Sequence, residues 1–258
     1  MESVTLTFED GIAVLTLNRP DSLNAMSQVM MKSLESQLVH LATLPGLRVL
    51  ILTGAGRAFS AGGDLVEFEQ ALKASKKTLL DYLEYNMGVL QLLEDLPVPV
   101  IGAVNGTAVA GGLETLLCCD ILVAAEGIKI GDGHTRYGVV PAAGATVRLG
   151  ERISPSHAAQ LFYTAGLVDA ETLRDWGLIN EVVPKVQLMS RVMELAKDIC
   201  KCSPEAIRHI KFLTGERART PDRQSRISAE LERFALHVDG TDLANGLAAF
   251  KAKQPVQY

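Results

Sequence analysis

The chain has few cysteines and few aromatic residues, and it lacks any long apolar run. Only four of its 258 residues are cysteine, at Cys118, Cys119, Cys200 and Cys202. Two such close pairs do not have the spacing of a zinc site, and buried thiols indicate a reducing, cytoplasmic setting. No stretch approaches the roughly 20 apolar residues of a transmembrane helix, and the opening residues do not resemble a signal peptide. We therefore expect no metal, no disulfide and no membrane span.

An excess of basic residues is also missing. The net charge is −5, whereas nucleic acids and anionic membranes call for a basic face. We expect neither as a partner. The chain is 48% apolar, which is enough for a large core, and its length fits one large domain or a domain with a helical appendage.

Hydrophobic patterning predicts an α/β protein of repeating units. A hairpin is expected over residues 4–17 around Asp10-Gly11. Apolar residues at helical spacing follow a capping Ser27. Buried strands alternating with helices are then expected over residues 49–52, 79–93, 97–104, 111–118 and 121–124.

Beyond Pro141 the pattern becomes mainly helical, with a short strand at residues 181–183. Ser-Pro and Thr-Pro pairs mark helix starts at residues 154, 203 and 220, and Asp169 is expected to cap a helix that stops at Gly177. We divide the chain into a core, residues 1–195, for ligand binding and catalysis, and a helical region, residues 196–258, for oligomerisation and capping of the active site.

Two glycine clusters carry the functional signal. The first, residues 54–65, starts like a dinucleotide fingerprint, but Phe59 stands where the third glycine belongs. No Gly-Lys-Ser/Thr follows, so a phosphate loop is excluded. The remaining Gly62-Gly63 pair either lets the backbone approach a ligand or makes a turn.

The second cluster, residues 104–114, ends a strand and begins a helix at Gly111 with Glu114 in its first turn. Unpaired N–H groups there suit a developing oxyanion, although Glu114 could simply complement the helix dipole. Each cluster follows a buried strand, so we expect both at one edge of the sheet.

These motifs together resemble the enoyl-CoA hydratase/isomerase (crotonase) superfamily along essentially the whole chain. The carrying segments are residues 18–25, 56–65, 99–106, 111–114, 119–121, 138–144, 178–183 and 249–255. The resemblance implies an α/β spiral of ββα units with a C-terminal helical region. It also implies a homotrimer or a dimer of trimers, and an acyl-CoA substrate with no separate cofactor.

The resemblance places two backbone donors for the thioester oxygen at Gly63 and Gly111. Losing such a donor costs about 3–4 kcal/mol. It also implies a pair of acid/base glutamates. The first falls on Glu114, but the second falls on His134, so the expected catalytic pair is Glu114 with His134.

Histidine can act as an acid or base near neutral pH, and Asp132 or Arg136 could shift its pKa in opposite directions. Three reactions remain open. Hydration of an enoyl-CoA would use Glu114 on water and His134 on Cα. Isomerisation would need one base, and a hydrolase or C–C-cleaving relative would use His134 with water. We favour the first two.

Two other classes of protein fit these residues less well. A non-catalytic CoA-binding scaffold does not need the retained Gly63, Gly111 and Glu114. A serine hydrolase would have only Ser60 as nucleophile, without its usual elbow. Residues expected to contact substrate or CoA, including candidate phosphate partners, are Arg19, Arg57, Ser60, Ala61, Gly62, Asp64, Leu65 and Lys253.

Overall fold

The structure is a computed structural model that describes residues 2–219 together with 241, 245, 252 and 254. Its strands are β1 (Val4–Glu9), β2 (Ile12–Leu17), β3 (Val49–Gly54), β4 (Ala58–Ser60), β5 (Val100–Val104), β6 (Thr107–Val109), β7 (Ile121–Ala125), β8 (Lys129–Gly131), β9 (Val168–Asp169) and β10 (Glu181–Val183). Its α-helices are α1 (Gln28–Thr43), α2 (Leu65–Ala74), α3 (Lys76–Glu94), α4 (Gly111–Leu117), α5 (Ala145–Arg152), α6 (Pro155–Thr164), α7 (Ala170–Asp175), α8 (Leu188–Cys200) and α9 (Pro204–Arg219). Three short 3-10 helices are η1 (Pro20–Ser22), η2 (His134–Tyr137) and η3 (Lys185–Gln187).

From β3 to β8, successive strands alternate between two sheets. The larger sheet has the order β1-β2-β3-β5-β7-β10, and the smaller has the order β4-β6-β8-β9. In each of the consecutive pairs β3/β4, β5/β6 and β7/β8, the first strand belongs to the larger sheet and the second to the smaller. Within the sheets, β3, β5 and β7 pair in parallel, and so do β4, β6 and β8. This is the predicted spiral of ββα units, and the α/β fold class is confirmed.

The hairpin, the first helix and the first buried parallel strand form where the local sequence predicts them. Asp10 and Gly11 both have positive φ and join β1 to β2 in register, as a two-residue hairpin turn requires. The Ser27 hydroxyl accepts a hydrogen bond from the Met30 N–H and caps α1. β3 is buried along its whole length, as expected of a parallel strand covered on both faces.

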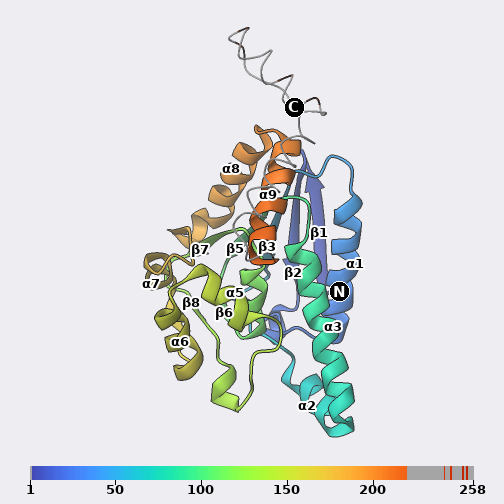
Figure 1. Cartoon of the computed structure of the whole chain (residues 1–258), viewed down its shortest axis with the longest axis vertical. Helices are drawn as coiled ribbons and strands as arrows, with labels where there is room; N and C mark the ends of the chain where they lie inside the picture. The colour runs from blue at the N-terminus through green and yellow to red at the C-terminus, as the bar shows by residue number, and fades with distance from the viewer. Residues whose placement is uncertain (1, 220–240, 242–244, 246–251, 253, 255–258) are drawn as a thin grey trace.

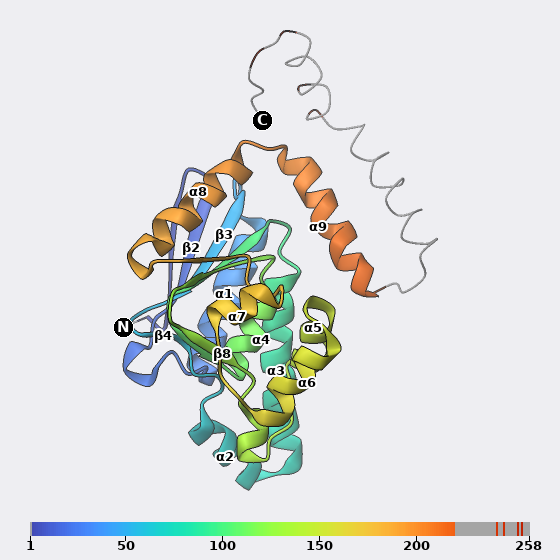
Figure 2. The ribbon, with the colours of Figure 1, turned by 90° about the vertical axis from the view of Figure 1, so that its left-hand side faces the viewer.

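Helices cover the larger sheet from both sides. α8 contacts β3, β5 and β7, while α1 and α3 lie on the opposite side of the strands (Figures 1 and 2). α2 and the start of α3 form one end of the molecule, and α9 extends beside the body near the other end (Figure 2).

Some expectations need adjustment. The helix expected over residues 79–93 is part of α3, which begins at Lys76, and α2 ends just before it at a capping Ser75. Asp169 precedes α7, but its side chain forms no cap hydrogen bond and instead pairs with Lys129. The expected boundary between residues 195 and 196 lies inside α8, where Ala196 is still buried. The helix start expected at residue 220 lies outside the described residues.

The cysteine expectations can also be compared with the structure. All four cysteines are free thiols, and Cys118 and Cys119 are buried in the core. Burial raises the pKa of the Cys118 thiol to about 12, so this group stays protonated and behaves as an apolar side chain. Across the described part of the chain, no helix combines the length and apolarity needed to cross a membrane.

Candidate active site

The two glycine clusters open onto one cavity of about 500 Å³. Its polar groups include Gly63, Gly111, Glu114 and His134, which are the four residues predicted for catalysis. Its walls are otherwise largely apolar and come from α1, α2, α3 and the segment 133–143. A concave apolar site with a few convergent polar groups is the usual setting of small-molecule chemistry.

The glycine clusters meet because β4 and β6 are parallel neighbours, so their carboxyl ends share an edge. A Cβ placed on Gly111 would lie 3.3 Å from the Gly63 nitrogen. Within residues 2–219, neither the Gly63 N–H nor the Gly111 N–H donates to a protein acceptor. Two adjacent, unpaired N–H groups at a cavity can hold one ligand oxygen.

The residue before Gly111 is backbone-strained. Ala110 has φ of 51°, a conformation that disfavours residues with a Cβ. Its N–H donates to the Gly131 carbonyl at 3.1 Å, and its carbonyl accepts from the Glu114 N–H at 3.0 Å. The fold therefore holds Ala110 in this turn from both sides, and the turn fixes the direction of the next N–H.

Glu114 is a buried carboxylate in the cavity wall, 4% exposed. Its Oε1 accepts from the Ala143 N–H at 2.9 Å and the Ala145 N–H at 3.4 Å. Burial raises the pKa of Glu114, although the charge of His134 and these two N–H groups act in the opposite direction. Its Oε2 accepts no hydrogen bond from the described residues, which leaves one oxygen for a proton transfer.

His134 is oriented by a fully buried carboxylate. Its Nδ1 lies 2.8 Å from Asp132 Oδ1, and its backbone N–H donates to Asp132 Oδ2 at 3.2 Å. Burial by itself lowers the pKa of His134, but the hydrogen bond and charge of Asp132, together with the charge of Glu114, outweigh burial and raise it. A carboxylate accepts a hydrogen bond, so Nδ1 carries the hydrogen and Nε2 is the atom left for proton exchange.

Two side chains brace the first glycine loop from behind. Asn24 is fully buried, and its amide donates to the carbonyls of Ala55, Ala58 and Phe59. The Ser60 hydroxyl donates to the Asn24 carbonyl at 2.9 Å and accepts from the Gly62 N–H at 3.1 Å. Ser60 has no exposed surface, so its predicted substrate contact does not fit the structure, and neither does a role as nucleophile.

The other predicted substrate contacts divide into two groups. Ala61 and Leu65 line the cavity. Gly62 is buried beneath it, while Asp64 caps α2 by accepting from the Val66 and Glu67 N–H groups. Both therefore support the site from outside the cavity wall.

The predicted phosphate partners also differ from one another. Arg19 Nη1 donates to the Ala25 carbonyl at 2.7 Å and pairs with Asp64 at 3.4 Å, so its charge is used within the protein. Arg57 is exposed and stays a predicted phosphate contact. Lys253 lies outside the described residues.

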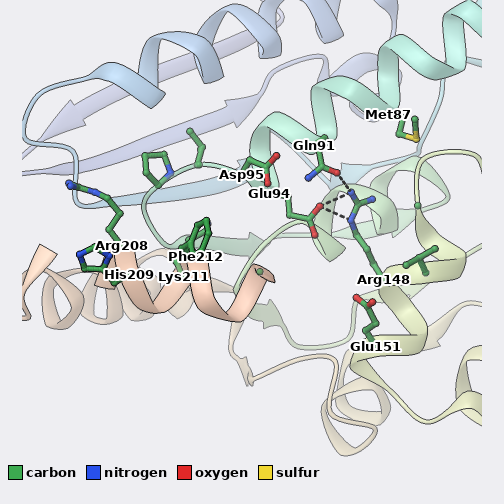
Figure 3. Close-up of a pocket in the computed structure, with 15 residues that line it drawn as sticks. Met87, Gln91, Glu94, Asp95, Arg148, Glu151, Arg208, His209, Lys211 and Phe212 are labelled. Atoms are coloured by element: carbon green, nitrogen blue, oxygen red, sulfur yellow. Dashed lines mark hydrogen bonds and ion pairs between the residues drawn. The ribbon is translucent and has the colours of Figure 1, made fainter. Parts of the chain in front are cut away.

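A second cavity, of about 610 Å³, lies between α3, α5 and α9 (Figure 3). It shares no lining residue with the first cavity. Arg148 projects from α5 to Glu94 and Gln91 of α3, and Arg208, Lys211 and Phe212 of α9 form the facing wall (Figure 3).

Arg148 also links this region to the catalytic cavity. Its Nη2 donates to Glu94 Oε2 at 2.7 Å, and its Nη1 donates to the Ala143 carbonyl at 2.7 Å. Because the N–H of Ala143 donates to Glu114, the arginine that pairs with Glu94 outside the cavity also holds the residue that contacts the buried carboxylate.

Sequence reasoning did not identify three residues at or behind the cavity. For Asp132, the sequence indicated only a neighbour that could shift the pKa of His134. Its position two residues before His134 is the signal that could have indicated the direct contact. Tyr82 lines the cavity on the same face of α3 as Asn86 and Leu90, at a helical spacing that resembles core packing. Arg148 shares no local pattern with Glu94, because the two are distant in sequence.

Comparison with known proteins places this geometry in a family. The profile described as enoyl-CoA hydratase/isomerase matches residues 7–258. The chain is 33% identical to the crotonyl-CoA hydratase of Syntrophomonas wolfei, over 100% of this chain and 98% of that protein. It is 31% identical to the short-chain-enoyl-CoA hydratase of Clostridium acetobutylicum, over 100% and 97%.

Solved structures give the same result. An enoyl-CoA hydratase from Bacillus anthracis superposes with a TM-score of 0.93 at 30% identity, covering 99% of this chain and 98% of that one. Another, from Geobacillus kaustophilus, gives a TM-score of 0.91 at 31% identity, covering 99% and 97%.

Proposed function

Because the chain belongs to the enoyl-CoA hydratase/isomerase family and is an acyl-CoA-processing enzyme, we propose that it adds water to a 2-enoyl-CoA. The observation that carries this proposal is the convergence of two acid/base side chains and two unpaired N–H groups on one cavity. Water addition needs a base, an acid and stabilisation of the enolate between them, and the cavity offers all three.

The base in this proposal is Glu114. Its Oε2 takes a proton from water as the water oxygen bonds to C3 of the enoyl chain. The electron pair of the C2–C3 double bond then moves toward the thioester carbonyl and forms an enolate. The raised pKa of Glu114 makes its carboxylate a stronger base than an exposed glutamate.

The enolate oxygen accepts hydrogen bonds from the Gly63 and Gly111 N–H groups. The charge on this oxygen grows during the reaction, so donors that are already in place stabilise the transition state more than the ground state. The strained Ala110 turn and the bracing of the first loop by Asn24 keep both donors fixed.

The acid in this proposal is His134. Its protonated Nε2 gives a proton to C2, which completes a 3-hydroxyacyl-CoA and leaves a neutral imidazole held by Asp132. The raised pKa keeps the imidazolium populated to higher pH than an ordinary histidine would.

We propose a homotrimer or a dimer of trimers, in the cytoplasm, that uses the thioester itself and no separate cofactor. Sedimentation analysis of the purified protein should then give the mass of three or six chains.

The reaction is tested by turnover of crotonyl-CoA in Glu114→Gln, His134→Ala and wild-type protein. We expect wild type to form the 3-hydroxyacyl product, and each variant to lose about 100-fold or more in kcat. His40→Ala, which changes an exposed histidine at the end of α1, should keep wild-type turnover.

Two results would count against the proposal. Full activity in His134→Ala, with a shifted double bond in the product, would replace hydration with one-base isomerisation. An absence of acyl-CoA binding by calorimetry would remove the enzyme interpretation.

A further inference from the structure

Met26 lies in the wall of the catalytic cavity and contacts both glycine loops. It follows the bracing Asn24 by two residues, and it is buried, with 4% of its surface exposed. Its backbone pairs with the first loop, and its side chain reaches the second. Met26 therefore adds a link between the two loops to the one made by the pairing of β4 with β6.

The backbone of Met26 sets the direction of the first donor. Met26 and Gly63 form a parallel bridge. The Met26 N–H donates to the Gly62 carbonyl at 2.8 Å, and the Met26 carbonyl accepts from the Asp64 N–H at 3.3 Å. In a parallel bridge both bonds go to the residues on either side of the partner, so the N–H of Gly63 itself points away from Met26. The pairing thus holds the loop and leaves this N–H for a ligand.

The side chain of Met26 lies against the second donor segment. A Cβ built on Gly111 would lie 3.4 Å from Met26 Sδ and 3.3 Å from the Gly63 nitrogen. Sδ also lies 3.7 Å from Thr115 Oγ1, whose hydroxyl donates to the Gly111 carbonyl at 2.8 Å. That hydroxyl has a single hydrogen, so the sulfur contributes mainly packing. The thioether therefore packs against the first turn of α4, at the residue that carries the second donor.

This packing bears on the distance between the two donors. The turn at Ala110 is strained, and a strained conformation persists only where its surroundings hold it. Without the Met26 side chain, a void would adjoin Gly111, and the atoms around a void lose their contacts on that side. One ligand oxygen must meet both N–H groups at hydrogen-bond distance, so a small shift of either donor weakens its stabilisation.

We propose that Met26 is a positioning residue, whose side chain holds the Gly111 N–H at the separation from the Gly63 N–H that one enolate oxygen requires. This inference rests on the proposed function, because the enolate belongs to that reaction. The charge on the oxygen is larger in the enolate than in the substrate. Loss of the alignment should therefore lower kcat more than it raises KM.

The kinetic test compares Met26→Ala, Met26→Leu and Met30→Ala with wild type on crotonyl-CoA. Met30 is the matched control, because it is a fully buried methionine near the start of α1 that does not line the cavity. We expect Met26→Ala to lose about tenfold or more in kcat, with KM changed by less than about threefold. Met26→Leu refills the space and should recover kcat to within about threefold of wild type. Met30→Ala should keep the wild-type kcat.

A spectroscopic test reads the oxygen site without turnover. A 3-ketoacyl-CoA forms an enolate readily, and the enolate absorbs in the near ultraviolet. At saturating ligand, we expect a smaller enolate fraction in Met26→Ala than in wild type, and an unchanged fraction in Met30→Ala. A residue that only stabilises the fold would not move this fraction.

Three outcomes would overturn the inference. One is a wild-type kcat in Met26→Ala, another is an equal loss of kcat in Met30→Ala, and the third is an unchanged enolate fraction in Met26→Ala. If Met26→Ala does not fold, Met26→Val leaves a smaller void, and the same expectations apply to it in the same direction. Wild-type protein that turns over no enoyl-CoA fails the proposed function, whereas wild-type turnover with an unaffected Met26 variant fails this inference alone.

Discussion

At the scale of single residues, the unusual feature is a histidine held by an aspartate where relatives of this family are expected to carry a glutamate. A glutamate needs burial to keep its proton near neutral pH, whereas His134 keeps one through the charge of Asp132. The pair Glu114 and His134 therefore contains one group that works ionised as a base and one that works protonated as an acid.

The pH dependence of turnover should reflect both groups. The raised pKa of Glu114 means that activity is lost as pH falls through a value above that of an ordinary glutamate. The raised pKa of His134 means that activity is lost as pH rises through a value above that of an ordinary histidine. Asp132→Asn keeps a hydrogen-bond acceptor but removes the charge, so the alkaline limb of the kcat profile should move down by about one pH unit. An unmoved alkaline limb in this variant would remove His134 from the role of acid.

Two neighbouring glycines should respond differently to the same substitution. Gly62 has φ of +92°, and an added Cβ would lie 2.7 Å from the Val109 carbonyl oxygen. Gly62→Ala should therefore lower the free energy of unfolding by about 1–3 kcal/mol. Gly63 has no atom within 4 Å of an added Cβ, so Gly63→Ala should leave stability within about 0.5 kcal/mol.

Activity should separate these variants as well. The Gly63 methyl would enter the cavity beside the proposed donor, and kcat/KM should fall at least about tenfold from misplacement of the thioester. Urea denaturation and steady-state kinetics on both variants make the comparison. Equal destabilisation by both substitutions would contradict this description of the loop.

At the scale of elements, the base depends on a contact between α3 and α5. Arg148 holds the Ala143 carbonyl, and the Ala143 N–H favours the ionised form of Glu114. Arg148→Met should loosen this peptide, raise the pKa of Glu114 further and lower kcat about tenfold, with the acid limb moving to higher pH. Arg148→Lys should recover part of both changes, because an ammonium can still reach one partner.

The matched control is Arg174→Met, which removes an exposed arginine paired with Asp175. Its kcat and pH profile should equal those of wild type. If Arg148→Met lowered kcat without moving the acid limb, Arg148 would have a structural role only.

Elements with a local cause were predictable from sequence, and elements with a distant cause were not. The turn at Asp10-Gly11 and the cap at Ser27 each involve neighbouring residues, so their patterns were sufficient. The strands of the smaller sheet have only two or three residues, which is too short for periodicity to indicate. The contact of Arg148 with Glu94 joins residues 54 positions apart and has no local signature.

At the scale of the whole molecule, resemblance to a family grouped residues that meet at one cavity, which no pattern within the chain did. Alone, the Gly62-Gly63 pair was equally consistent with a turn, and Glu114 with a dipole partner. Their meeting at one cavity results from the parallel pairing of β4 with β6.

The distribution of strands between two sheets also affects how the chain reaches its native state. Among the described strands, β1 and β2 pair across a tight turn, whereas β3 and β5 join residues such as Leu50 and Val100. Parallel pairs need long crossovers, and contacts that are distant in sequence slow folding because loop closure precedes their stabilisation. Folding speed and yield during synthesis should therefore be sensitive to changes in β3 and β5, including changes that leave the finished enzyme stable and active.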